Sequence, residues 1–323
     1  RLIALTALKD FDINRNMAFK EMLKLNNRNN KININDLGYL IGPILNAGGR
    51  LGKSSYASEL LSSDDIDVIN IKSNELILLN NKRKEIETAI INEIDFKKIE
   101  DENKDVIIYY KPNINEGLIG IISARLKDYF NKPSIVITNS NELLKGSARS
   151  VYNYNIGRLV KNLIDKNILI TGGGHNMAAG FTLEENKLKN FENFVYDDFS
   201  NVGISNNNNF TYDAEISPLA FNLDFYNDIK KLEPFGVGNP IPTFLLKDLK
   251  VIKFTILNNK HISLILKSKM GFSIKCISFN SVDNKIGEYL MNYKNTLNVL
   301  GQINENFWNN KNTLQLTVRD LIL

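Results

Sequence analysis

The stretch Thr171-Gly172-Gly173-Gly174-His175-Asn176-Met177-Ala178-Ala179-Gly180 decides the fold of the central part of the chain. Its three consecutive glycines carry no side chains, so backbone N–H groups there can approach an anion closely. We predict a turn from a strand at residues 168–171 into a helix, whose N-terminus would add partial positive charge. A phosphate would fit there, and His175 would donate a hydrogen bond to it or to a scissile oxygen. The alternative is a tight strand-to-helix turn with a capping histidine.

Strands alternate with helices around this stretch. Short apolar segments indicate strands, and apolar residues at helical spacing indicate helices. We predict strands at residues 106–110, 133–138, 143–149 and 168–171, and helices at residues 117–130 and 156–165. This alternation predicts an α/β domain whose mixed or parallel sheet is covered by helices.

A second motif, Lys145-Gly146-Ser147-Ala148-Arg149-Ser150, lies on one of these strands. Side chains alternate along a strand, so Lys145, Ser147 and Arg149 share one face. An ammonium, a hydroxyl and a guanidinium on one face form a phosphate clamp, in which Arg binds two oxygens at once. The alternative is a solvent-facing edge strand.

A third motif, residues 42–52, contains four glycines and presents Arg50 ahead of a helix at residues 56–61. We predict a glycine-rich loop that adds a further phosphate or nucleotide contact. A helix-capping turn explains the same residues equally well.

The segments before the α/β section are apolar or helical in pattern. Residues 2–10 form a short apolar run that predicts a buried strand, and residues 16–25 have the spacing of an amphipathic helix. Residues 65–99 contain neither Gly nor Pro, which predicts one long connecting helix with at most one break.

The C-terminal third follows a different pattern. Residues 201–209 are polar and without hydrophobic period, which predicts a linker. Short strands are predicted after it, at residues 210–216, 244–257, 261–269, 272–280, 296–303 and 313–321. Five or six strands in so short a segment indicate a small closed β-barrel.

The composition excludes several classes of protein. With 323 residues, of which 43% are hydrophobic and 24% charged, the chain has the composition of a globular protein of about two domains. Its one cysteine, Cys276, excludes an intramolecular disulfide framework and a cysteine-based zinc site. The lack of disulfides is typical of proteins in a reducing cytosol. The sequence contains no uninterrupted run of about 18 apolar residues, which is the length that a membrane-spanning helix needs. The net charge of +4 is only a weak sign of nucleic-acid binding. Residues 209–323 carry 13 basic and 10 acidic side chains, so most of the positive net charge lies in the C-terminal third.

Only two histidines occur, His175 and His261, so we do not expect this chain alone to assemble a two-metal site of carboxylates and imidazoles. The chain begins at Arg1, and we expect it to be the remainder of a longer protein whose upstream part would supply such a centre.

Taken in order, five motifs resemble the RecJ family of single-stranded-DNA-specific 5′→3′ exonucleases, members of the DHH/DHHA1 phosphoesterases. They are residues 42–52, 116–126, 145–150, 173–180 and 233–240. The resemblance implies that residues 1–40 are the C-terminal remnant of a DHH domain and that residues 41–100 are the glycine loop and the long connecting helix. It further implies an α/β DHHA1 domain at residues 101–202 and an all-β OB-fold at residues 209–323.

The resemblance also implies roles for individual residues. Two Mn²⁺ or Mg²⁺ ions would be held mainly by the absent part of the DHH domain, with Asp10 as a surviving ligand and Asp12 as its substitute. The 5′-phosphate and adjacent backbone would be held by a set in which His175 is also catalytic: Arg50, Ser147, Arg149, Gly173, Gly174 and His175. Two departures affect this set, because Ile44 stands where many members have Arg and Asn115 where many have His.

The barrel is expected to bind the trailing strand with a basic groove and aromatic platforms, as OB-folds do. The candidates are Lys253, Lys260, Lys267 and Trp308. The alternatives are ordinary solvated lysines and a tryptophan that packs against the barrel. His261 follows a turn into a strand, where we expect a structural role or a minor backbone contact.

The implied function is metal-dependent 5′→3′ exonucleolytic hydrolysis of single-stranded DNA in DNA repair and recombination, by a cytoplasmic monomer without membrane contact. This chain would supply the parts that hold the 5′-phosphate and the strand, and would be inactive alone. Single-stranded DNA is the expected ligand, and a single-strand-binding protein and a helicase are candidate partners. The alternatives are a phosphodiesterase of short oligonucleotides or cyclic dinucleotides, and a non-catalytic adaptor that binds single-stranded DNA.

Overall fold

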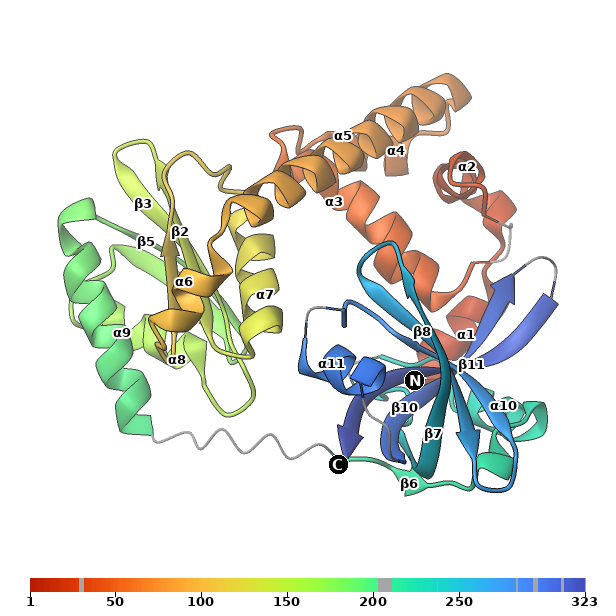
Figure 1. Ribbon diagram of the computed structural model, residues 1–323. Coiled ribbons are helices and arrows are strands. Elements are labelled where there is room, and N and C mark those ends of the chain that lie inside the picture. The colour runs from red at the N-terminus through yellow and green to blue at the C-terminus, as the bar shows by residue number, and fades with distance from the viewer. Residues whose placement is uncertain are drawn as a thin grey trace. The chain divides into compact units, whose positions relative to one another are not determined.

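The computed structural model describes residues 1–28, 32–202, 211–236, 238–282, 284–292, 296–308 and 311–322, and the side chains of residues 307, 308, 311 and 312 lie outside this description. The chain divides into two compact units. One is Phe11–Asn206, and the other combines Arg1–Asp10 with Asn207–Leu323 (Figure 1). The predicted linker at residues 201–209 lies largely outside the described residues.

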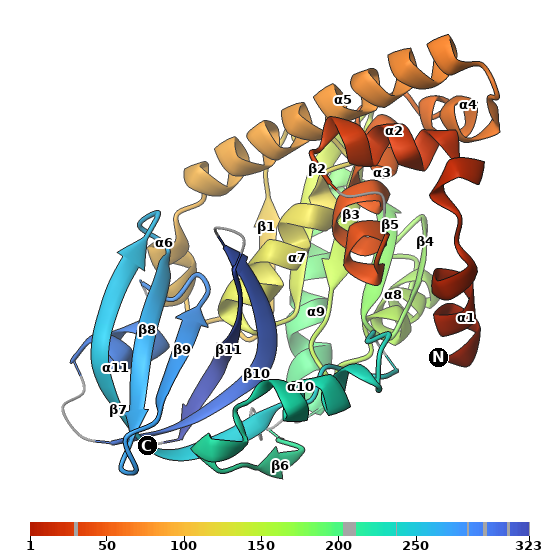
Figure 2. The same ribbon diagram turned by 90° about the vertical axis from the view of Figure 1, so that its right-hand side faces the viewer.

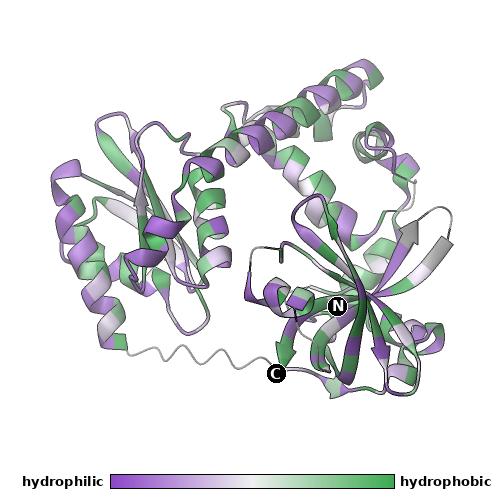
Figure 3. Ribbon diagram, viewed as in Figure 1, coloured by the Kyte–Doolittle hydropathy of each residue, from purple (hydrophilic) through white to green (hydrophobic). Residues whose placement is uncertain are grey.

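The first part of the unit Phe11–Asn206 is helical. It contains η1 (Ile13–Arg15), α2 (Met17–Leu25), η2 (Asp36–Ile41), α3 (Gly42–Arg50), α4 (Tyr56–Ser62), α5 (Ile66–Glu93) and α6 (Phe96–Asp101). Helices α2, α3 and α4 all contact α5, along which hydrophobic and hydrophilic residues alternate (Figure 3). The predicted amphipathic helix is confirmed as α2, and the long connecting helix as α5, with its break just before α6.

The predicted glycine-rich loop at residues 42–52 is wrong, because Gly42–Arg50 form helix α3. Pro43 stands in its first turn, where proline is common, and η2 leads directly into it. Gly48 serves close packing: a Cβ there would lie 2.6 Å from the carbonyl oxygen of Lys53 and 3.2 Å from Leu76 of α5. Gly48 thus lets α3 approach α5, whereas Gly52, with φ +81°, lies in the turn that follows α3.

The second part of this unit is a five-stranded mixed sheet with helices on both faces, which confirms the predicted class (Figure 2). Its elements are β1 (Ile107–Tyr110), α7 (Ile119–Phe130), β2 (Ser134–Ser140), β3 (Leu143–Arg149), α8 (Ile156–Asp165), β4 (Thr171–His175), β5 (Ala178–Leu183), η3 (Glu185–Lys187) and α9 (Leu188–Val202). The strand order is β1-β2-β3-β5-β4, with β1 and β2 parallel and the other pairs antiparallel.

Alternation along the strands builds a core on each face of the sheet. Val136 packs with Ile122 and Leu126 of α7 on one face. Ile135 and Ala148 pack with residues of α8 and α9 on the other. Helix α7 contacts β2 and β3. On the same face of the sheet, the part formed by β5 and β4 therefore remains available for a cavity.

The predicted strand-to-helix turn at the glycine cluster is wrong. Gly172, Gly173 and Gly174 lie inside β4, which pairs antiparallel with β5. At two of the three glycines the neighbours leave no room for a side chain: a Cβ on Gly172 would lie 2.8 Å from Val160 of α8, and one on Gly174 would lie 2.5 Å from Ala179 of β5.

The other unit is a closed barrel, as predicted. Its elements are β6 (Ala214–Glu215), η4 (Pro218–Ala220), α10 (Leu223–Lys230), β7 (Phe244–Leu257), β8 (His261–Ser268), β9 (Ser273–Ser278), α11 (Lys285–Asn292), β10 (Leu297–Trp308) and β11 (Lys311–Ile322). Five strands close in the order β7-β8-β9-β11-β10, because β10 pairs back onto β7. Strand β6 only extends the sheet from β7.

The predicted buried strand at residues 2–10 is wrong, because this segment is helix α1 (Leu2–Asp10). None of its residues is buried, and Ile3 is 88% exposed. A short apolar run fits a strand and a helix equally well, and here no sheet edge takes it up. Arg1 donates hydrogen bonds to the carbonyl oxygens of Lys231 and Leu232 in the barrel unit.

In the described part of the chain, no helix combines the length and apolar character needed to cross a membrane.

We predict that Gly146→Ala lowers the free energy of unfolding by about 1–3 kcal/mol through overpacking. A Cβ at this position would lie under 3.0 Å from three ring atoms of Phe181. The matched control is Gly180→Ala on the neighbouring strand, where the nearest atom would be 3.8 Å away. Urea denaturation of both variants checks this, and equal losses of stability would contradict it.

Candidate functional site

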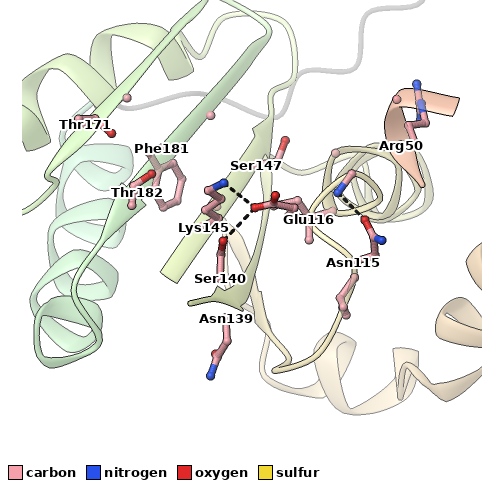
Figure 4. Close-up of a pocket in the computed structure, with 18 of the residues that line it drawn as sticks. Arg50, Asn115, Glu116, Asn139, Ser140, Lys145, Ser147, Thr171, Phe181 and Thr182 are labelled. Atoms are coloured by element: carbon pink, nitrogen blue, oxygen red, sulfur yellow. Dashed lines mark hydrogen bonds and ion pairs between the residues drawn. The ribbon is translucent and has the colours of Figure 1, made fainter. Parts of the chain in front are cut away.

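A cavity of about 820 Å³ lies within the unit Phe11–Asn206. It is on the face of the sheet that α7 packs against, next to the part that α7 covers. The end of α3, the loop before α7, the end of β2 and strands β3, β4 and β5 line it (Figure 4). Both the loop that was predicted around Arg50 and the strand that carries Ser147 therefore contribute to one site.

The floor of the cavity is a row of small residues. Ser147 of β3 is paired with Gly180 of β5, and Gly180 with Gly173 of β4. Directly paired residues point to the same face of a sheet. The row therefore offers one hydroxyl and two positions without side chains, and a Cβ on Gly173 would meet no atom within 4 Å.

Arg149 and Ser147 lie against the first turn of α7. The Arg149 guanidinium Nη1 donates to Ser147 Oγ at 3.2 Å and to the carbonyl oxygen of Ala148 at 2.9 Å. A Cβ on Gly120 would be 3.0 Å from Arg149 Nη2 and 3.1 Å from Ser147 Oγ. Glycine therefore favours this close approach, since a larger residue would require both side chains to shift.

The helix itself adds positive character at this point. Its N-cap residue is Leu118, whose side chain cannot accept a hydrogen bond from the first turn. The N–H groups that begin a helix need such acceptors or a ligand, and together they carry partial positive charge. A guanidinium, a hydroxyl and a helix N-terminus converge here, which is a combination suited to a phosphate.

Arg50 approaches the same cavity from the end of α3. Its backbone is held by the loop before α7, since a Cβ on Gly117 would lie 2.8 Å from Arg50 Cα. Burial lowers the pKa of both Arg50 and Arg149, and for Arg50 the nearby Arg83 and Arg149 lower it further while Glu87 opposes this. Both guanidiniums remain charged at neutral pH. A bound anion would relieve their mutual repulsion.

The other end of the cavity is electrically balanced. Lys145 shares the face of Ser147 and Arg149, as predicted, but its ammonium is 2.5 Å from the carboxylate of Glu116. Ser140 donates a second hydrogen bond to the same carboxylate oxygen at 3.0 Å (Figure 4). The predicted clamp is therefore reduced to Ser147 and Arg149 in this structure.

The remaining residues of the predicted set are placed differently. Gly174 faces the opposite side of the sheet, where a Cβ would lie 2.5 Å from Ala179, so it is a packing residue. His175 ends β4, in the row of Ala178 and Arg149, and its side chain is exposed. It does not line the cavity, and its catalytic role stays a prediction. The helix N-terminus at the cavity belongs to α7, not to a helix after Gly174.

The two departures from the resembled pattern have local explanations. Ile44 is almost fully buried in α3, where it contributes to packing of the helices. Asn115 Oδ1 accepts a hydrogen bond from the Gly117 N–H at 2.9 Å and shapes the loop before α7. Sequence reasoning missed the part that α7 plays, although Gly117 and Gly120 within one motif were the available signal.

No group of three or more His, Cys, Asp or Glu side chains that could hold a metal ion occurs in the described part of the chain. Asp10 is the last residue of α1. These residues do not fit a two-metal site, and the role of Asp10 as a ligand stays a prediction.

The barrel unit carries a lysine face on β7, β8 and β9. Lys253 is paired with Ile265, and Ile265 with Lys275, while Lys250 is paired with Lys267. All four lysines are exposed on the outer face, and none forms an ion pair with a described residue. We refer to Lys250, Lys253, Lys267 and Lys275 as the lysine face.

Three other predictions concern the ends of these strands. Lys260 is exposed in the turn between β7 and β8. His261 Nδ1 accepts a hydrogen bond from the Asn280 N–H at 2.9 Å, and its ring contacts Phe279 edge to face. The side chain of Trp308 lies outside the described residues, so its stacking role stays a prediction.

Comparisons with known proteins identify both units. The DHHA1 domain family matches residues 103–201, and the RecJ OB domain family matches residues 212–320. The single-stranded-DNA-specific exonuclease RecJ of Bacillus subtilis is 26% identical over 99% of this chain and 41% of its own length. The RecJ of Escherichia coli is 28% identical over 87% of this chain and 52% of its own. The chain thus spans about half the length of these relatives.

Solved structures show the same fold. RecJ from Thermus thermophilus in complex with Mn²⁺ superposes with a TM-score of 0.76 over 95% of this chain and 44% of that protein, at 22% identity. A second structure of the same protein, in complex with Mg²⁺, gives a TM-score of 0.74.

We predict that Gly120→Ala weakens binding of inorganic phosphate about tenfold, because the added methyl group would displace Arg149 and Ser147. Gly38→Ala is the matched control, since a Cβ there would meet nothing within 4 Å. Calorimetric titration with phosphate measures the affinities, and thermal melting verifies that both variants are folded. Equal phosphate affinity of the two variants would exclude the site at the first turn of α7.

Proposed function

Since this chain carries the DHHA1 and OB domains of the RecJ family, we propose that it supplies the end-holding and strand-binding parts of a single-stranded-DNA-specific 5′→3′ exonuclease. The observation that carries this proposal is the convergence of Arg50, Ser147 and the first turn of α7 on one open cavity, with the Arg149 guanidinium in contact with Ser147 and close to Gly120. Single-stranded DNA arises in repair and recombination, and we infer these processes as its setting.

The cavity suits a terminal phosphate better than any internal one. A terminal phosphate carries about 1.5 to 2 negative charges near pH 7, whereas an internal phosphodiester carries one. Arg50 and Arg149 match the larger charge. Ser147 Oγ accepts a hydrogen bond from Arg149, so its own proton remains free to be donated to a phosphate oxygen. A 5′-hydroxyl end would gain none of these charge-assisted contacts.

The metal requirement of the whole enzyme rests on residues other than those described. The Thermus thermophilus RecJ structures are complexes with Mn²⁺ and with Mg²⁺, and we propose the same ions for the whole enzyme. The described residues of this chain offer no ligand set for them. The contribution of this chain is therefore to hold the DNA by its end and along its strand.

The lysine face would bind the strand through its phosphates, with little regard to sequence. Its four ammonium groups have no described ion-pair partner, so none must be released before DNA binds. A strand-binding surface of this kind supports a polymeric substrate over a cyclic dinucleotide or a very short oligonucleotide.

We predict that the chain binds a 5′-phosphorylated oligonucleotide about tenfold or more tightly than the same oligonucleotide with a 5′-hydroxyl. Arg149→Ala should abolish this preference, because hydrogen bonds to charged groups contribute about 1.5–3 kcal/mol each. Arg15→Ala is the control, since its side chain is 88% exposed on η1 outside the cavity. Fluorescence anisotropy at two salt concentrations measures the affinities. Equal binding of both ends by the unmodified chain would favour the adaptor.

We predict that the double variant Lys253→Ala/Lys267→Ala weakens binding of both oligonucleotides by the same factor. The slope of log K against log salt should fall by about 1.4, because each lost phosphate contact removes about 0.7 for a single strand. The control is Lys247→Ala/Lys269→Ala, whose lysines are already paired with Glu215 and Asp248 in the same unit. An unchanged slope in the first variant would show that DNA does not contact the lysine face.

A further inference from the structure

The cavity contains a carboxylate that a phosphate-binding site does not require. Glu116 lines it, and its carboxylate accepts hydrogen bonds from Ser140 at 3.0 Å and Lys145 at 2.5 Å. These two partners lower the pKa of Glu116, with the Lys145 contact as the larger cause. The carboxylate is therefore negatively charged at neutral pH.

The backbone on either side of Glu116 is fixed. The buried hydroxyl of Thr138 accepts a hydrogen bond from the Ile114 N–H and donates one to the Ile114 carbonyl oxygen, both at 3.0 Å. Asn115 then caps the Gly117 N–H. A residue between two such anchors is held over the cavity, unlike a charge on a freely moving loop.

Glu116 is also close to the predicted phosphate position. Its partner Lys145 lies two residues before Ser147 on the same face of β3, which corresponds to about 7 Å along the strand. The cavity of about 820 Å³ is much larger than one phosphate group. Its volume would therefore admit a longer phosphate chain, and the charges that line the cavity would determine whether further phosphates bind.

We propose that Glu116 is a specificity-determining residue that restricts the cavity to one terminal phosphate and rejects 5′-triphosphate ends. This proposal rests on the proposed function, because it assumes that the 5′-phosphate binds at Ser147 and Arg149. One phosphate is balanced by Arg50 and Arg149. Further phosphates would meet the Glu116–Lys145 ion pair, in which the carboxylate holds the Lys145 ammonium and leaves no unpaired cation for a second anion on this face of β3.

The test compares one single-stranded oligonucleotide carrying either a 5′-monophosphate or a 5′-triphosphate, bound to the full chain. The unmodified chain should bind the monophosphate about tenfold more tightly. Glu116→Gln should remove or reverse this preference, because Lys145 is then free to bind a second phosphate. Glu93→Gln is the matched control, since Glu93 is also paired with a lysine, Lys111, outside the cavity, and it should keep the original ratio.

A second variant keeps the test valid if Glu116→Gln folds poorly. Lys145→Gln leaves the carboxylate uncompensated, so the preference for the monophosphate should increase. In the double variant Glu116→Gln/Lys145→Gln, the triphosphate affinity gained by Glu116→Gln alone should be lost. This pattern would show that Glu116→Gln increases triphosphate affinity because Lys145 binds a phosphate in place of the Glu116 carboxylate.

Two results would overturn the proposal and are distinguishable. If the 5′-phosphate is preferred over the 5′-hydroxyl but Glu116→Gln keeps the original ratio of monophosphate to triphosphate binding, only the role of Glu116 fails. If the unmodified chain does not distinguish a 5′-phosphate from a 5′-hydroxyl, the proposed function fails together with it.

Discussion

The close contact between the first turn of α7 and strand β3 is the constraint on which the candidate site depends. Gly120 favours it, because a Cβ there would lie only 3.0 Å from Arg149 Nη2 and 3.1 Å from Ser147 Oγ, and these side chains would have to shift. The contact is maintained from behind by the packing of Ile122 and Leu126 against Val136. A cationic site is thus produced by helix-on-sheet packing, and the hydrophobic core stabilises an arrangement that the burial of Arg50 and Arg149 opposes.

Although the net charge of the chain is only +4, the basic side chains of the two candidate binding surfaces differ in whether they are paired with carboxylates. In the cavity, the charge of Lys145 is balanced by Glu116, while Arg50 remains available and Arg149 lies against Ser147. In the barrel, lysines at positions 247 and 269 are paired with carboxylates, whereas the lysine face has no described ion-pair partner. The cavity thus offers cations for an end-specific contact, and the lysine face offers cations for a sequence-independent contact.

Much of the fold could be predicted from the sequence because it follows local periodicity. The alternation of β3 placed Lys145, Ser147 and Arg149 on one face, and the spacing of the later strands indicated the barrel. The errors arose at glycines and at a short apolar run. Gly48 and Gly174 permit close packing of neighbouring backbone and side chains, yet in sequence they resemble residues of a turn. The pairing of Glu116 with Lys145 and the approach of α7 to Arg149 are long-range contacts, which no local pattern reveals.

The most direct test of the account is a crystal structure of the chain with a short 5′-phosphorylated oligonucleotide. We expect the terminal phosphorus to lie in the cavity beside the first-turn N–H groups of α7, within hydrogen-bond reach of Ser147 Oγ and of the Arg50 guanidinium. A terminal phosphate bound at Lys145 with Glu116 displaced, or bound only to the lysine face of the barrel, would contradict it.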